Sequence, residues 1–141
     1  MTIKPKINSR AKGAAFERDI AARLEGLTGI RFKRNLEQVR AVDHCDLTAD
    51  APDWPFSLEL KRYATGTACK PAWQEQATRA AEKTGKIPVV VYQFDRRDTR
   101  VSVPLSAIGK ALGQEWSEPG WAEITVEALA YLAGELMAGA A

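Results

Sequence analysis

Hydrophobic residues at helical spacing mark the first element of the chain. They recur at intervals of four, four and three residues, at Phe16, Ile20, Leu24 and Leu27. This spacing puts them on one side of a helix, where they form a stripe that can face a core. Ser9 suits an N-cap and Gly29 suits a stop. The pattern therefore predicts a helix over residues 9–27.

Alternating and continuous apolar runs predict strands in the next part of the chain. The expected strands cover residues 30–35, 44–49, 56–63, 87–94 and 100–103. The run at 87–94, Ile-Pro-Val-Val-Val-Tyr-Gln-Phe, is the most hydrophobic. Such a run is typical of a central strand that is buried on both faces.

Three further helices are expected, over residues 71–84, 106–112 and 126–137. In the first of them, Pro71 fits the opening turn, and Trp73, Ala77, Ala80 and Ala81 fall on its inner side. Trp116 and Trp121 lie in a Gly- and Pro-containing stretch that we interpret as a linker. The order α-β-β-β-α-β-β-α-α predicts an α/β fold. Its first three strands should be antiparallel, and the crossover helix lets the buried strand run parallel to its neighbour.

Composition narrows the class of protein. With 141 residues, 45% of them hydrophobic and 27% charged, the chain suits one soluble domain over residues 1–141. It has neither an apolar run of membrane-spanning length nor an apolar signal core, so we expect a cytoplasmic protein. Cys45 and Cys69 are far apart and are interpreted as free thiols. A single histidine and two isolated cysteines give no zinc-ligand spacing.

Charge is unevenly distributed although the net charge is only +2. Basic residues crowd the beginning, where Arg10 and Lys12 are candidates for contacting DNA. Arg34 and Arg40 follow, and either could hold a phosphate. Basic segments beside an acidic pocket are what a metal-dependent nuclease needs, although two solvated faces would give the same pattern.

The segment Leu58-Glu59-Leu60-Lys61 carries the candidate chemistry. On a strand, Glu59 and Lys61 share one face and the two leucines share the other. Asp46 from the preceding strand would add a second carboxylate, giving an oxygen-rich site suited to Mg²⁺ or Mn²⁺. A lysine beside the metal can stabilise developing negative charge or help to deprotonate a water. The alternatives are a surface charge pair and a turn-capping aspartate, and Asp43 is a rival for the metal position.

The order of these features resembles the PD-(D/E)XK nuclease superfamily. The features are Glu17 on the first helix, Asp46, Glu59-Leu60-Lys61, a helix with Gln74 and Gln76, and a strongly apolar strand. More narrowly, the chain resembles archaeal-type and phage Holliday junction resolvases, whose opening helix is similar to Lys12-Gly13-Ala14-Ala15-Phe16-Glu17-Arg18. The resemblance covers residues 10–103. It implies a restriction-endonuclease-like mixed sheet flanked by helices, with residues 104–141 as a C-terminal helical extension.

The resemblance also implies roles for individual residues. Asp46 and Glu59 would bind the metal, and Glu17 would complete the acidic cluster. Lys61 would be the catalytic lysine near the attacking water. Gln76 would match the glutamine found on the following helix, with Gln74 as the alternative.

The implied activity is hydrolysis of DNA by a metal-activated water. The absence of an evident base-reading helix agrees with recognition by shape, and the resemblance implies branched DNA, such as a four-way junction, as the substrate. Two symmetric cuts would require a homodimer. The alternatives are a repair or restriction nuclease of the same superfamily, and a non-catalytic DNA-binding module with the same fold.

Overall fold

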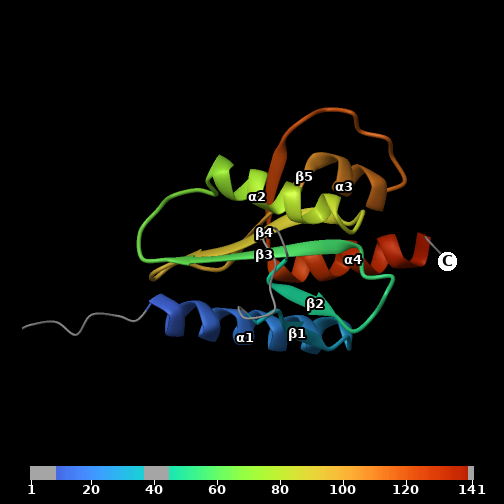
Figure 1. The fold of residues 1–141 in the computed structure, drawn as a ribbon. Helices are drawn as coiled ribbons and strands as arrows, with labels where there is room; N and C mark the ends of the chain where they lie inside the picture. Colours follow the sequence, from blue (N-terminus) through green and yellow to red (C-terminus); the bar gives the residue numbers. More distant parts are fainter. Residues whose placement is uncertain (1–8, 37–44, 140–141) are drawn as a thin grey trace, which may run out of the picture.

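The computed structural model describes residues 9–36 and 45–139, which form a mixed sheet with helices on both faces (Figure 1). Its strands follow one another across the sheet in chain order. This architecture confirms the predicted α/β fold. The elements are α1 (Ser9–Thr28), β1 (Phe32–Arg34), β2 (Leu47–Ala49), β3 (Phe56–Tyr63), α2 (Pro71–Glu82), β4 (Ile87–Phe94), β5 (Arg100–Pro104), α3 (Leu105–Ala111), β6 (Trp121–Ile124) and α4 (Val126–Gly139).

Strand pairing confirms the predicted topology. β1, β2 and β3 pair antiparallel, as expected for strands joined by short connections. α2 then crosses over the sheet, so β4 runs parallel to β3 over its whole length. β5 and β6 return antiparallel. β3 and β4 therefore form the centre of the sheet.

The helix α1 begins and ends almost where its pattern predicts. Three stripe positions are buried: Phe16, Ile20 and Leu24. The fourth, Leu27, is 46% exposed, so this part of the prediction is wrong. The stripe continues instead at the next four-residue step, where Thr28 is half-buried and its hydroxyl donates to the Leu24 carbonyl at 2.6 Å. Gly29, with φ +75°, follows the last turn.

Two apolar clusters cover the two faces of the sheet. The larger cluster joins α1, α3 and α4 to one face, through Leu58 and Leu60 of β3 and Val89 and Val91 of β4. The smaller cluster packs Trp73 and Ala77 of α2 on the other face, against alternate residues of β4. The inward positions predicted for α2 (Trp73, Ala77, Ala80, Ala81) are all buried.

Two strand predictions need correction. Residues 44–49 were expected to be one strand, but β2 begins at Leu47 and Asp46 lies just before it. The amide of Asp46 donates to the carbonyl of Leu58, which is also the register partner of Leu47. Two successive residues thus oppose one residue of β3, and regular pairing stops there. Likewise, the first strand is shorter than the predicted 30–35, since β1 covers only Phe32–Arg34.

The segment after residue 103 is not the helical extension that was expected. Trp121, interpreted as part of a linker, begins β6, which pairs with β5 at the edge of the sheet. Four residues are too few to show a clear alternation of apolar and polar side chains, so β6 is recognised only by its pairing with β5. Behind it, α4 packs Val126, Leu129 and Leu132 into the larger cluster. The terminal segment thus completes the sheet and its core.

Candidate active site

The candidate site lies in the middle of β3, on the face covered by α2. Glu59 and Lys61 point to this face, because Leu58 and Leu60 occupy the opposite core. Glu59 is 3% exposed, and the Nζ of Lys61 lies 3.7 Å from its Oε1. The pair is therefore mostly buried, unlike an ordinary surface charge pair.

Asp46 is held against the same stretch of β3. Its Oδ2 accepts a hydrogen bond of 2.7 Å from the backbone amide of Leu60, the residue between Glu59 and Lys61. Its own amide donates to the Leu58 carbonyl at 2.9 Å. The Asp46 side chain is buried, at 7% exposed. These bonds bring the first predicted carboxylate to the strand that carries the second.

Asn35 is a residue that the sequence reasoning missed. Its amide N–H donates to the Asp46 carbonyl at 3.0 Å, and its side-chain Nδ2 donates to the Cys45 carbonyl at 2.5 Å. It therefore fixes the segment that presents Asp46. An asparagine after a short strand is common, so the sequence held no signal for this function.

The helix α2 supplies the third part of the site. Gln76 accepts a hydrogen bond of 2.7 Å from the Nζ of Lys61 through its Oε1. Gln74, the predicted alternative, lies on the other flank of the helix and donates to Ser102 Oγ at 3.1 Å. Two residues along a helix correspond to about 200° of rotation, which is why the two glutamines diverge. The geometry thus pairs Gln76, and not Gln74, with the lysine.

Glu17 takes a different partner. Its Oε2 lies 2.8 Å from the Nε of Arg34, which joins α1 to β1. Residues 9–36 and 45–139 contain no group of three or more His, Cys, Asp or Glu side chains placed to hold a metal ion. The roles predicted for Glu17 at the metal and for Arg34 at a phosphate stay predictions.

The other basic candidates are spread over the molecule. Lys12 forms an ion pair of 2.6 Å with Asp95, and Arg62 approaches the same carboxylate oxygen at 2.7 Å. Hydrogen bonds from Lys12 and then from Arg62 lower the pKa of Asp95. Arg10 is exposed at the start of α1. Arg40, like Asp43, lies outside the described residues.

The thiols do not offer alternative chemistry. Cys45 and Cys69 are free, as expected. Burial raises the pKa of Cys69, although a hydrogen bond with Ser102 opposes the shift. A thiol with a raised pKa stays protonated near neutral pH and is a poor nucleophile.

The donor set at β3 fits a hard divalent cation. Mg²⁺ is bound in proteins by one or two carboxylates and completes its shell with waters and substrate phosphates. Asp46 and Glu59 supply two buried carboxylates, so a third protein ligand is not required. The adjacent Lys61 ammonium complements an anionic substrate. The residues present are therefore compatible with Mg²⁺ or Mn²⁺ and a phosphate ester.

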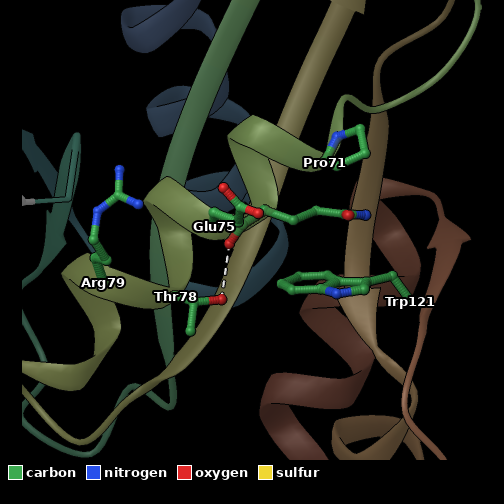
Figure 2. Close-up of a pocket in the computed structure, with 6 residues that line it drawn as sticks. Pro71, Glu75, Thr78, Arg79 and Trp121 are labelled. Carbon is green, nitrogen blue, oxygen red and sulfur yellow. Dashed lines mark hydrogen bonds between the residues drawn. The ribbon is translucent and has the colours of Figure 1, made fainter.

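A separate pocket of about 400 Å³ lies on the other flank of α2. Figure 2 shows the indole of Trp121 reaching from β6 towards α2, with Pro71 and Glu75 on one side of the ring and Thr78 at its end. The remaining lining residues are Gln74 and Arg79. The pocket contains none of Asp46, Glu59 and Lys61, so it is separate from the carboxylate site.

Comparisons with known proteins agree with this architecture. A family model described as "Phage putative PDDEXK endonuclease" matches residues 8–133. Among solved structures, Hjc from Archaeoglobus fulgidus, a Holliday junction resolvase from an archaeal hyperthermophile, is similar with a TM-score of 0.53 and 22% identity. That match covers 86% of this chain and 98% of the archaeal one. No curated protein matches significantly. None of the described helices is long and apolar enough to cross a membrane.

Proposed function

The chain belongs to the PD-(D/E)XK family of phage endonucleases, and we propose that it cuts phosphodiester bonds in branched DNA with Mg²⁺ or Mn²⁺ bound at Asp46 and Glu59. Membership supports endonuclease activity, and DNA as the substrate is part of the proposal. The metal, the residues and the branched substrate are the parts proposed here.

One observation carries the proposal. Asp46 accepts a hydrogen bond from the amide of Leu60, which lies between Glu59 and Lys61. Gln76 accepts a hydrogen bond from the ammonium group of the lysine. Acidic and basic groups buried in a small space cost folding free energy unless they are paired, so they point to a function. Two carboxylates and an amine are also the groups that phosphodiester hydrolysis needs.

Each of these side chains would have its own role in the reaction. Asp46 and Glu59 would hold the metal, which when bound polarises phosphoryl oxygens and makes water a better nucleophile. Lys61 would place its ammonium group beside the reacting phosphate and offset the negative charge that grows in the transition state. Gln76 would fix the direction of that ammonium group through the hydrogen bond of 2.7 Å. Gln76 is therefore a positioning residue.

Branched DNA is favoured by the fold. The similar archaeal protein is a Holliday junction resolvase, and this chain shares its architecture over most of both lengths. A four-way junction is resolved by two symmetric cuts, which a C2 dimer supplies. We therefore propose that the active form is a homodimer.

A panel of DNA substrates tests the proposal. The purified chain is incubated with a synthetic four-way junction, a flap and a linear duplex, with Mg²⁺ or with EDTA. Paired symmetric nicks in the junction, lost in EDTA and in Lys61→Met, are expected. Cutting of the linear duplex alone would contradict junction selectivity and indicate another nuclease of the family. If none of the substrates were cut, the catalytic proposal would be overturned, and the alternative of a non-catalytic DNA-binding module would be favoured.

A further inference from the structure

A second, smaller pocket of about 110 Å³ lies at the far end of the sheet from α4, between the segment that follows β3 and the turn that joins β4 to β5. Its polar lining consists of Thr67, Tyr92, Arg97, Asp98 and Arg100. None of the residues assigned above to catalysis belongs to it. Its chemistry is therefore separate from that of the carboxylate site.

The walls of this pocket are fixed by backbone geometry. Gly66 has φ +155°, and a Cβ at this position would overlap the ring of Phe94, so the segment can lie on that ring only with glycine. On the other side, Arg96 has φ +61° in the turn after β4. The amide of Arg97 donates to the Phe94 carbonyl at 3.1 Å, and Gln93 Nε2 donates to the Arg97 carbonyl at 2.8 Å. The backbone that presents Arg97 is thus held in place.

The hydroxyl of Tyr92 is the most unusual group in the pocket. Tyr92 is 1% exposed, and its buried oxygen has no hydrogen-bond partner among the described residues. Buried hydroxyl groups almost always have a partner, because leaving one unpaired costs folding free energy. The oxygen is closed off from solvent in this structure, so a ligand with acceptor oxygens would satisfy this donor only after the surrounding side chains move.

The charged residues of the pocket indicate the kind of ligand. Arg97 and Arg100 supply two guanidinium groups, and Asp98 supplies one carboxylate. Arg100 is also paired with Glu123, at 3.0 Å between Nη1 and Oε2. Asp98 and Glu123 balance the two positive charges, so the preference depends on geometry: guanidinium groups match the oxygens of a phosphate in a bidentate fashion. A phosphate group therefore fits better than a cation or a neutral molecule.

Strand register relates this pocket to the catalytic lysine. Lys61 of β3 pairs with Tyr92 of β4, and Tyr92 pairs with Arg100 of β5, so the three lie in one row on the face covered by α2. Two strand spacings separate Lys61 from Arg100 by about 10 Å. The rise of about 3.4 Å per nucleotide is measured along the helix axis. Successive phosphates also turn around that axis and so lie farther apart than the rise, and a separation of about 10 Å therefore spans fewer than three nucleotides.

We propose that this pocket binds a backbone phosphate of the DNA, within about three nucleotides of the phosphate that is cut. The Tyr92 hydroxyl, Arg97 and Arg100 would donate to its oxygens. The inference rests on the proposed function, since it places the same DNA strand across the sheet. It adds a second contact that sets where the scissile phosphate lies.

The test measures junction binding in EDTA, which prevents metal-dependent cleavage, over a series of salt concentrations. Arg97→Ala is compared with Arg96→Gly, which removes the same charge from the same turn without lining the pocket and at a φ that glycine adopts freely. Loss of one phosphate contact should lower the salt slope by about 0.9 and weaken binding on the order of tenfold in Arg97→Ala alone. Equal losses in both variants would overturn the proposal.

Two further variants probe the pocket itself. Tyr92→Phe removes only the hydroxyl oxygen and should weaken DNA binding while the protein stays folded in a thermal melt. Asp98→Asn removes the opposing carboxylate and should tighten binding. Unchanged affinity in both variants would contradict a phosphate ligand.

A phosphate scan gives the position of the contact. Single phosphates around the cut are replaced one at a time by neutral methylphosphonates. The parent protein should lose affinity at one position within about three nucleotides of the cut, and Arg97→Ala should lose nothing more there. If Arg97→Ala and the methylphosphonate at that position each lowered affinity independently, Arg97 would not contact that phosphate and the assignment would be overturned. Cleavage by the parent protein is measured separately, so a parent that cuts junctions while all pocket variants bind normally refutes this inference and leaves the proposed function intact.

Discussion

The two faces of the sheet have different chemistry. The face under α1 and α4 is lined by apolar side chains such as Leu58 and Val91, and the larger core cluster consists of hydrophobic residues throughout. The face under α2 buries Glu59 and Ser102 beside the apolar Trp73. Burial of apolar surface stabilises a fold, whereas burial of charge opposes it. One face therefore mainly supports the fold, while the other gives up stability to bury the charged groups to which the proposed catalysis is assigned.

The largest effect is expected from Lys61→Met, on the face under α2. The substitution keeps most of the aliphatic stem and removes the ammonium group, so the loss should appear in the rate of cleavage. We expect a decrease of roughly 10²- to 10⁴-fold, typical of a lost group that acts on charge or protons in the transition state. Single-turnover cleavage of a junction measures it. The exposed Lys33 of β1 gives a matched control, Lys33→Met, and an equal decrease there would contradict the assignment.

Leu58→Ala tests the opposite face of the same strand. Leu58 is fully buried, so its truncation should lower the free energy of unfolding by about 2–5 kcal/mol. Urea unfolding measures the change. Because the leucine does not face α2, the cleavage rate per folded molecule should stay near that of the parent. If Leu58→Ala lowered the cleavage rate without lowering the free energy of unfolding, the two faces of the sheet would not have separate roles.

A smaller effect is expected for Gln76→Ala. The Lys61 ammonium would lose the acceptor at 2.7 Å that orients it, and cleavage should slow on the order of tenfold. Gln76→Glu keeps an acceptor and should recover part of the rate. Gln74→Ala is the control, and equal effects of both alanine variants would show that α2 only supports packing.

The smallest effect is expected for an ion pair away from the buried charges. Hydrogen bonds from Lys12 and Arg62 lower the pKa of Asp95, so this carboxylate stabilises the fold above its unfolded pKa of about 3.9. The contribution is lost as the pH falls through the lower folded pKa. Asp95→Asn should therefore be slightly less stable than the parent at neutral pH, and the difference should close in acid. Urea midpoints across this range measure it, with the exposed Asp53→Asn as control. If the stability difference between Asp95→Asn and the parent grew as the pH fell, the predicted pH dependence would be contradicted.

The sequence predicted those parts of the fold that depend on a long local pattern. β3 and β4 begin and end at the predicted residues, because an eight-residue alternating pattern in β3 and an eight-residue apolar run in β4, each between turns, leave little freedom. The alternation along β3 was also enough to place Glu59 and Lys61 on one face. β6 was missed because its definition depends on pairing with β5 and not on its four residues.

Contacts between distant segments could not be predicted in the same way. The sequence offered no basic residue one helical turn from Glu17, yet Arg34 reaches it from β1. The choice between Gln74 and Gln76 depended on the rotation of α2 over the sheet, which the spacing alone did not settle. Asn35 forms hydrogen bonds with backbone atoms at and next to Asp46, and a contact with the backbone cannot be predicted from the types of the two residues.

The most direct test is a crystal of the protein soaked with Mn²⁺ and measured by anomalous scattering. The account predicts a peak bound by carboxylate oxygens of both Asp46 and Glu59, with the Lys61 amine beside it, and loss of that peak in Glu59→Gln. A peak that touches neither carboxylate, or carboxylates too far apart to share an ion in crystals that bind Mn²⁺ elsewhere, would contradict it.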